Sequence, residues 1–384
     1  MMRILHIISG LDVGGAETFL LRLIPHLRNA GLQSSVIYLS GEGQLVSDYR
    51  KAGITVYDCR LDRGLAAVLG LCKLFSRVKS EKPDLIQTWM YHADLVGSIL
   101  GLLFRKRVVW GVRQSNLGAQ LNKRSTLFIA RICSRISKYL PRSIIYNSEA
   151  ARTSHESIGY FRSKAEVVHN GIDCQKFTEE PGARKFIRTE LRIPQDALVV
   201  GHIGRYDPQK DHATLLEAMP IVRAALPNVH FVLAGKGITW SNVGLFSKFD
   251  RAEDGPWLHL LGPRSDIANL LMSMDIVCSS SRGESFPNAV LEAMASGIPC
   301  VSTNVGDVAK LIGETGIIVQ PEAPNALADS CISLLSRPPD ERKELGERAR
   351  QRVLNQFSLE KTAARFVEIY VASQGDSSFR KAVN

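Results

Sequence analysis

The chain has 384 residues, of which 45% are hydrophobic and 22% charged, so it can bury the cores of two or three soluble globular domains. Its net charge of +10 is uneven: residues 1–172 hold 24 Lys and Arg against 12 Asp and Glu, whereas residues 173–384 hold 24 against 26. The basic excess belongs to the N-terminal half, which we expect to meet something anionic.

The cysteines and apolar runs exclude several classes of protein. No cysteine pair has CxxC spacing, so we expect reduced, buried thiols in a cytoplasmic protein, with neither disulfides nor a zinc site. We see no signal peptide before the first expected strand, 3–9. The longest apolar run, 95–104, is too short to span a bilayer, so a membrane contact would be peripheral.

Short apolar strands alternate with longer helical patterns, which indicates an α/β fold with parallel sheets covered by helices. The strands expected in the first half are 3–9, 35–39, 55–59, 85–88, 108–111, 143–146 and 166–169. Those expected in the second half are 199–203, 230–234, 258–261, 276–279, 300–303 and 316–319. We therefore predict two doubly wound sheets, in domains 1–172 and 173–356, then a helix within 357–371 and a tail, 372–384.

The first strand is followed by a glycine-rich loop that opens a helix over 18–27. Gly14, Gly15 and Glu17 lie in this loop, where glycines allow another group to approach the backbone closely. The spacing is not that of a GxGxxG dinucleotide site. The alternative is a plain tight turn between strand and helix.

Two further loops of the first half follow expected strands and carry polar side chains. His92 comes after strand 85–88, and Arg113 comes after strand 108–111. A later helix has a basic face beside an apolar one. Its basic residues are Lys123, Arg124, Arg131, Arg135 and Lys138, beside Phe128, Ile129, Ile132 and Ile136. This face is either solvated or a contact for an anionic membrane surface.

In the second half, Gly204, Arg205 and Lys210 follow strand 199–203, at the end of the strand where ligands bind in such sheets. An arginine fork and a lysine point charge are suited to stabilising negative charge on a diphosphate. A solvated basic loop is the alternative. Gly235 and Arg264 follow the next two strands, and Arg264 is equally compatible with a surface position.

The most informative stretch is 283–297, where Glu284 and Glu292 are separated by seven residues around a helix start expected to be capped by Asn288. Unpaired N–H groups make a helix start a seat for phosphate. A carboxylate one turn further would repel phosphate, but it can accept hydrogen bonds from ribose hydroxyls. Phosphate flanked by two hydroxyl-rich groups describes a nucleotide-sugar. Two solvated glutamates beside a buried turn are the alternative.

These motifs together resemble the retaining family-4 (group 1) glycosyltransferases. The resemblance rests on Glu284 and Glu292 followed by Ala-Met-Ala-Ser-Gly-Ile-Pro, on Arg205 and Lys210, and on the Gly-Gly-Ala-Glu loop at 14–17. It is strong over 198–320 and looser over 1–172, and it implies the GT-B fold of two Rossmann-like domains. It also implies that the last helix crosses back to the first domain. Gly306-Asp307 and Lys310 depart from the family pattern, which puts the local sugar contacts in question.

The resemblance assigns roles to individual residues. Catalytic roles fall to Arg205, Lys210, Glu284 and His92, although some relatives carry the corresponding histidine at the position of Trp89. The residues implied in nucleotide-sugar binding are Gly15, Gly204, Gly235, Arg264, Ser285, Phe286, Pro287, Asn288, Ala289 and Glu292. Pro287 lacks an N–H and only shapes the turn. Gly14, Glu17 and Arg113 are expected on the acceptor side.

The expected reaction is glycosyl transfer with retention, from a nucleotide-diphosphate sugar to a hydroxyl of a glycan or lipid-linked acceptor. No DxD or HExxH motif occurs, so neither a metal nor another cofactor is implied. Another GT-B chemistry, such as an epimerase or phosphorylase, is the first rival. A non-catalytic lipid- or nucleic-acid-binding protein is the second, although we see no nucleic-acid-binding motif and expect no nucleic-acid partner. We expect a cytoplasmic protein associated with the inner face of the membrane; the sequence names neither the sugar nor the base.

Overall fold

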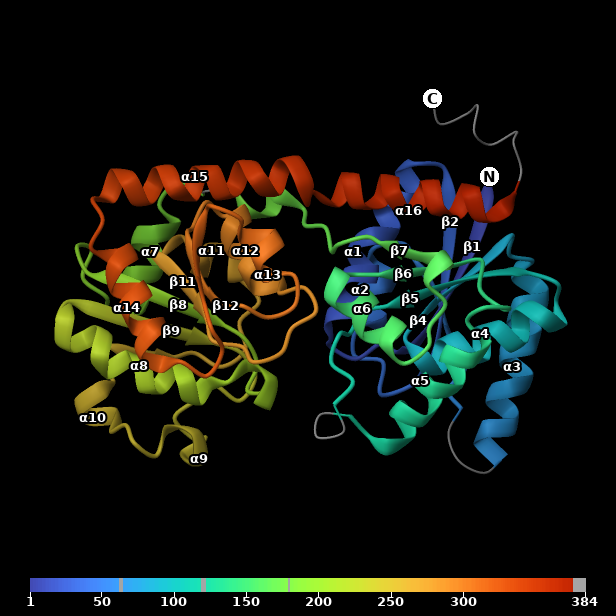
Figure 1. Ribbon diagram of the computed structural model, residues 1–384, viewed down its shortest axis with the longest axis horizontal. Helices are drawn as coiled ribbons and strands as arrows, with labels where there is room; N and C mark the ends of the chain where they lie inside the picture. The colour runs from blue at the N-terminus through green and yellow to red at the C-terminus, as the bar shows by residue number, and fades with distance from the viewer. Residues whose placement is uncertain (62–64, 119–121, 179, 376–384) are drawn as a thin grey trace. The chain divides into compact units, whose positions relative to one another are not determined.

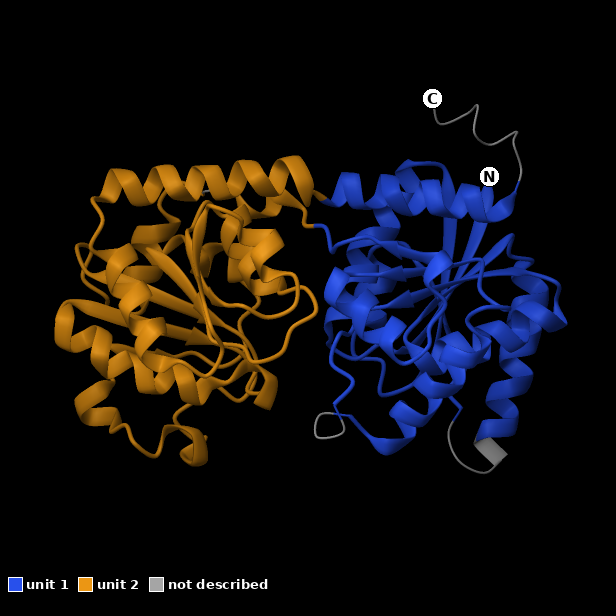
Figure 2. Ribbon diagram, in the orientation of Figure 1, with its two compact units in different colours: residues 1–171, 359–384 blue, residues 172–358 orange. Residues whose placement is uncertain are grey.

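The computed structural model describes residues 1–61, 65–118, 122–178 and 180–375. It divides into two compact units, residues 1–171 with 359–384 and residues 172–358 (Figure 2). Each unit contains one parallel β-sheet with helices on both faces (Figure 1). The two doubly wound sheets predicted from the sequence are confirmed.

Unit 1 is built on a seven-stranded sheet of order β3-β2-β1-β4-β5-β6-β7. Its strands are β1 (Met2–Gly10), β2 (Leu32–Ser40), β3 (Thr55–Asp58), β4 (Leu85–Trp89), β5 (Arg107–Val112), β6 (Ser143–Tyr146) and β7 (Ala165–Val167). Its helices are α1 (Gly15–Asn29), α2 (Val46–Lys51), α3 (Leu65–Glu81), α4 (Tyr91–Leu103), α5 (Arg124–Ile136), α6 (Glu149–Ser157), the 3₁₀ turn η1 (Arg162–Lys164) and α16 (Leu359–Gln374).

Unit 2 is built on a six-stranded sheet of order β10-β9-β8-β11-β12-β13. Its strands are β8 (Leu198–Ile203), β9 (Val229–Ala234), β10 (Leu258–Leu260), β11 (Ile276–Ser279), β12 (Cys300–Thr303) and β13 (Gly316–Val319). Its helices are α7 (Ala183–Glu190), α8 (His212–Ala225), α9 (Val243–Phe246), α10 (Arg251–Asp254), α11 (Ile267–Met272), α12 (Asn288–Ala295), α13 (Val308–Ile312), α14 (Pro324–Leu335) and α15 (Pro339–Gln356), with 3₁₀ turns η2 (Cys174–Phe177) and η3 (Pro208–Lys210).

The strand order locates the functional edge of each sheet. In unit 1 the order reverses between β1 and β4, and in unit 2 between β8 and β11. Ligands of open parallel sheets bind beyond the carboxyl ends of the strands at such a reversal, because the following loops diverge to opposite faces there. The loops after β1, β4, β8 and β11 are therefore the expected ligand-binding loops.

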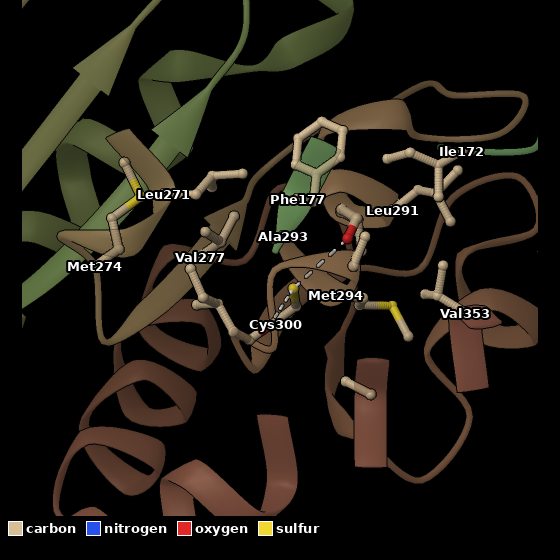
Figure 3. Packing of buried hydrophobic residues seen from close by; sticks show 14 of the residues in the cluster. Ile172, Phe177, Leu271, Met274, Val277, Leu291, Ala293, Met294, Cys300 and Val353 are labelled. Carbon is tan, nitrogen blue, oxygen red and sulfur yellow. Dashed lines mark hydrogen bonds between the residues drawn. The ribbon is translucent and has the colours of Figure 1, made fainter. Parts of the chain in front are cut away.

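Buried apolar residues fill both faces of each sheet. In unit 2, Leu291 and Met294 of α12 belong to the same core cluster as Val277 of β11, Cys300 of β12 and Val353 of α15 (Figure 3). Each fully buried side chain of this size contributes roughly 1.5–3 kcal/mol by leaving water. This packing fixes the start of α12 next to the loop that follows β11.

The C-terminal helix differs from the sequence prediction in its end. Residues 372–374, expected in the tail, form the last part of α16, and residues 376–384 lie outside the described residues. The side chains of Leu359, Phe366 and Tyr370 are buried in one cluster with residues of α1 and β1. Helix α16 is thus an integral part of the core of unit 1.

Candidate functional site

Two loops at the reversal point of the unit 2 sheet carry the predicted cations and one of the predicted carboxylates. The loop after β8 contains Gly204, Arg205 and Lys210, and the loop after β11 contains Glu284 and leads into α12. Since β8 and β11 are paired neighbours, both loops leave the same edge of the sheet. Lys210 and Glu284, which are 74 positions apart in the chain, meet there.

Lys210 and Glu284 contact one another directly. The Lys210 Nζ donates a hydrogen bond to the Glu284 Oε1 at 2.5 Å, and the Ser281 hydroxyl donates to the same oxygen at 3.0 Å. Only 24% of the lysine side chain and 15% of the glutamate side chain are exposed. In this half-desolvated setting, a charge-assisted pair is stronger than on an open surface.

Arg205 is more open to solvent and is oriented by an aspartate of its own loop. Its Nε and Nη2 donate to the Asp207 Oδ2 at 3.1 and 2.9 Å, and 59% of its side chain is exposed. Although burial opposes it, hydrogen bonds from the Gln209 N–H and Arg205 lower the pKa of Asp207. Asp207 thus orients Arg205, and most of its side chain stays accessible to an anion.

Two glycines pack directly against the backbone of these loops. Gly235 has φ +155°, and a Cβ there would collide with the Gly204 carbonyl oxygen and approach the Arg205 nitrogen to 2.8 Å. Gly306 has φ +56°, and a Cβ there would collide with the carbonyl oxygens of Glu284 and Ser285. Glycine is required at both positions for conformation and for close approach. The sequence prediction included Gly235 but treated Gly306 only as part of a departure from the family pattern.

The start of α12 corrects one detail of the sequence prediction. Pro287 occupies the N-cap position and Asn288 is the first helical residue, so no Asn side chain caps the helix. Phe286 is buried and packs against the Phe357 ring at 5.6 Å between centroids. Ala289 lies in the first turn, whereas the half-buried Glu292 lies one turn further along. Glu284 thus lies in the loop before α12, whereas the first-turn N–H groups and Glu292 belong to the helix itself.

Arg264 is already engaged with carboxylates. Its guanidinium contacts Glu190 at 2.6 Å and Asp266 at 2.6 Å, and hydrogen bonds to these carboxylates, Asp266 first, raise its pKa. The pairing ties the end of α7 to the loop after β10. Arg264 therefore has a structural role in this unit beside the nucleotide contact that the sequence suggested.

Two buried histidines lie beneath the cationic loop and were not singled out from the sequence. The rings of His202 and His212 are 4.9 Å apart, and the His202 Nδ1 is 3.0 Å from the Cys278 carbonyl oxygen. Burial lowers the pKa of His202 to about 3 and that of His212 to about 4. Both rings are therefore neutral near pH 7 and add no positive charge next to Lys210.

In unit 1, the glycine loop after β1 is fixed by side-chain bonds. The Asp12 Oδ1 accepts hydrogen bonds from the backbone nitrogens of Glu42 and Gly43 at 3.1 and 2.9 Å. Gly14 is the N-cap of α1, Gly15 its first residue, and the Glu17 carboxylate folds back over Gly14. The loop presents glycine backbone at a helix start, as the sequence predicted.

The two positions considered for the family histidine differ in exposure. Trp89 is fully buried, and its Nε1 donates to the His6 Nδ1 at 3.3 Å. His92 is exposed at the second position of α4, although partial desolvation lowers its pKa. Of the two residues, only His92 has a side chain that a ligand of unit 1 can reach.

Arg113, expected on the acceptor side, is half-buried, and its guanidinium lies against three aromatic rings. Its guanidinium carbon is 4.4, 5.0 and 5.3 Å from the ring centroids of Phe19, Trp89 and Phe366. It also donates to the Asn170 Oδ1 at 3.0 Å. Burial lowers the pKa of Arg113 to about 9, so it remains a cation at neutral pH. Its Nε and Nη2 atoms are buried, so little of the guanidinium is open to an acceptor in this conformation.

The predicted basic helix is α5 with its flanks, and its charged residues are exposed. Phe128, expected on the apolar side, is 64% exposed, and α4, which packs on α5, exposes Leu102 and Leu103 at 63% and 60%. Helix α3 exposes Val68, Leu69, Leu71 and Phe75. Unit 1 therefore displays apolar side chains beside cationic ones. Within the described ranges, no helix is long and apolar enough to cross a bilayer, and no group of three or more His, Cys, Asp or Glu side chains is placed to hold a metal.

Two parallel-sheet α/β units, with loops at each reversal point, are the architecture of a GT-B protein. Residues 13–176 match the family model described as Glycosyltransferase Family 4, and residues 197–337 match the one described as Glycosyl transferases group 1. The chain belongs to the group 1, family 4 glycosyltransferases.

Relatives with known names cover most of the chain. It is 28% identical to a D-inositol 3-phosphate glycosyltransferase of Corynebacterium urealyticum, over 94% of this chain and 91% of that protein. It is 24% identical to the UDP-Gal:alpha-D-GlcNAc-diphosphoundecaprenol alpha-1,3-galactosyltransferase of Escherichia coli, over 82% and 81%. In structure it is similar to Anabaena HepE in complex with UDP and glucose, with a TM-score of 0.84 at 22% identity over 97% of this chain and 100% of that chain.

Proposed function

We propose that this glycosyltransferase moves a sugar, with retention of anomeric configuration, from a nucleotide-diphosphate sugar to a hydroxyl of a glycan or lipid-linked acceptor. The observation that carries the proposal is the Lys210–Glu284 contact at the reversal point of the unit 2 sheet. A cation, a carboxylate and a helix start are together suited to a diphosphate joined to a sugar.

Each residue then has a chemical role in the proposed reaction. Lys210 and Arg205 stabilise the negative charge that grows on the leaving diphosphate as the glycosidic C–O bond breaks. The first-turn N–H groups of α12 bind the phosphates, while Glu292 accepts hydrogen bonds from the ribose hydroxyls. Glu284 orients the transferred sugar and is not a nucleophile.

Retention follows from displacement on the face that the leaving group vacates. The acceptor hydroxyl oxygen forms the new bond to the anomeric carbon, and its proton passes to a leaving phosphate oxygen. On the side of unit 1, we propose that His92 contacts the donor sugar and that Gly14 and Glu17 border the acceptor. Arg113 is not assigned an acceptor contact, because its guanidinium lies against three rings and its Nε and Nη2 are buried.

We further propose that the acceptor is reached at an anionic membrane surface. Support comes from the exposed cations of α5, which lie on the same unit as the exposed Phe128, Leu102 and Leu103. Cations attract anionic headgroups, and apolar side chains insert between them. The Escherichia coli relative is named for an acceptor on diphosphoundecaprenol, which is consistent with a lipid-linked substrate.

The test begins with a thermal-shift panel of UDP-, GDP- and ADP-sugars. A donor present at about 100 times its Kd raises the free energy of unfolding by about 2.7 kcal/mol, so the correct nucleotide should stand out. No stabilisation by any donor would favour a non-catalytic binder. Product analysis with and without acceptor then separates transfer from epimerisation or phosphorolysis.

The decisive variant is Lys210→Ala, with the exposed Lys343→Ala on α15 as its control. Removal of one group that stabilises developing negative charge costs about 10²–10³-fold in kcat. Near-normal turnover by Lys210→Ala would overturn the assignment.

A further inference from the structure

The loops after β8 and β11 are joined by more than the Lys210–Glu284 pair. The Arg282 N–H donates to the Gln209 carbonyl at 2.8 Å, and the Ser280 hydroxyl donates to the Lys210 carbonyl at 3.0 Å. These bonds connect the loops at Gln209 and Lys210 on one side and at Ser280 and Arg282, just before Glu284, on the other. The distance between the loops is therefore set by several separate contacts.

A second ion pair crosses between the same two loops. Arg282 Nη2 lies 2.7 Å from Asp211 Oδ1, and Arg282 Nη1 lies 3.4 Å from the exposed Glu322. Asp211 directly follows Lys210, and Arg282 lies two positions before Glu284. The Arg282–Asp211 pair thus runs beside the Lys210–Glu284 pair from one loop to the other.

Asp211 is a constrained residue. Its side chain is 1% exposed, so its carboxylate depends on partners to offset the cost of burial. Its φ is +46°, in the left-handed region, and its carboxylate caps α8 by accepting from the Thr214 N–H at 3.5 Å and from the Thr214 hydroxyl at 2.7 Å. A non-glycine residue keeps this conformation only where its surroundings enforce it. Asp211 therefore fixes the turn from which Lys210 projects.

We propose that Arg282 and Asp211 are positioning residues that hold Lys210 and Glu284 at their working separation once a donor is bound. The inference rests on the proposed function. A bound donor competes for the direct pair, since its phosphates attract Lys210 and its sugar hydroxyls attract Glu284. The direct contact then weakens, and the Arg282–Asp211 pair keeps the loops at the same spacing without touching substrate.

The test uses Arg282→Gln and Asp211→Asn in the full-length protein. Asparagine tolerates the left-handed region and can still cap α8, so Asp211→Asn removes the charge and keeps the turn. Arg365→Gln is the matched control, because Arg365 is 48% exposed, as against 45% for Arg282, and also contacts two carboxylates. It lies on α16 of unit 1, whereas both loops belong to unit 2.

We expect each loop variant to lower kcat about 10–100-fold, since misplacement by about 1 Å can cost about 10²-fold. The effect of the double variant should not exceed that of the stronger single variant, because both changes break one contact. Arg282→Lys, which retains a cation, should recover part of the rate. Arg365→Gln should turn over like the wild-type protein.

Amide hydrogen exchange of the donor-free protein provides a readout that does not depend on turnover. Segments 205–214 and 280–286 should exchange faster than in the wild-type protein in both loop variants, and at the wild-type rate in Arg365→Gln. Unchanged exchange in these segments, or a kcat within about twofold of wild type, would overturn the proposal. If the wild-type protein transfers no sugar from any donor, the proposed function fails, and exchange alone decides whether the pair holds the loops.

Discussion

Replacing Arg113, whose guanidinium Nε and Nη2 are buried, tests whether unit 1 needs a cation at this position or only its shape. Cation–π contacts contribute about 0.5–2 kcal/mol each, and a hydrogen bond to a charged group about 1.5–3 kcal/mol. Arg113 contacts three rings and donates to the Asn170 side chain. Against this stands a desolvation cost of several kcal/mol, and within the described residues its Nε and Nη2 have no hydrogen-bond partner.

The two sets of terms nearly cancel, so the outcome depends on the replacement. Arg113→Met keeps the volume and removes the buried charge, and should change the free energy of unfolding by less than about 1 kcal/mol. Arg113→Ala leaves a cavity among the rings and should cost about 2–4 kcal/mol. Arg113→Lys buries a more strongly hydrated point charge without the planar fork, and should be at least as damaging as alanine.

The assay is urea unfolding combined with amide hydrogen exchange, which reports the two units separately. Amide exchange in segments of unit 1 should be slowest in Arg113→Met, faster in Arg113→Ala and fastest in Arg113→Lys. Residues 172–358 serve as an internal reference. If Arg113→Met proved as damaging as Arg113→Lys, the charge itself would be essential and the reasoning from shape would be refuted.

Three further predictions concern a loop, acidification and the thiols. Gly306→Ala should force the Glu284 loop to move and lower kcat/KM for the donor at least about tenfold, because its Cβ meets two carbonyl oxygens; wild-type kinetics would contradict this. Burial lowers the pKa of His202 to about 3 and that of His212 to about 4, so below about pH 6.5 the unfolded chain binds more protons than the folded one. The free energy of unfolding should therefore fall as the pH drops from about 7 to about 5, by up to about 1.4 kcal/mol per histidine per pH unit. A thermal stability that did not change over this pH range would count against neutral buried rings. Cys72 is exposed and the other six cysteines are buried, so a thiol reagent should modify one cysteine in the native protein and seven in denaturant; fast native labelling of several would show that the cores open.

The sequence was sufficient for the features that depend on local pattern. Most strands are short apolar runs, so the sequence pattern located the strands of both sheets to within a few residues. The ends of those strands placed Lys210 and Glu284 at a functional edge. Their direct contact could not be predicted, because it depends on the pairing of β8 with β11. The same pairing brings Arg282 to Asp211.

Arg113 shows why local pattern fails for some charged residues. An arginine directly after a strand ordinarily lies in a solvated loop, and the residues that follow Arg113, 114–116, are polar. The rings around it come from α1, β4 and α16, separated by up to about 350 positions in the chain. Only the docking of α16 onto unit 1 completes the enclosure, and this is a tertiary event without a local signal.

The contribution of α16 to the core of unit 1 has a consequence for synthesis of the chain. Residues 172–358 form a continuous unit that can fold as soon as they leave the ribosome, whereas unit 1 lacks one helix until residue 374 has been made. The half that is translated first is therefore completed last. Until then the surface that receives Phe366 and Tyr370 stays uncovered, and a nascent or C-terminally truncated chain presents it to chaperones and proteases.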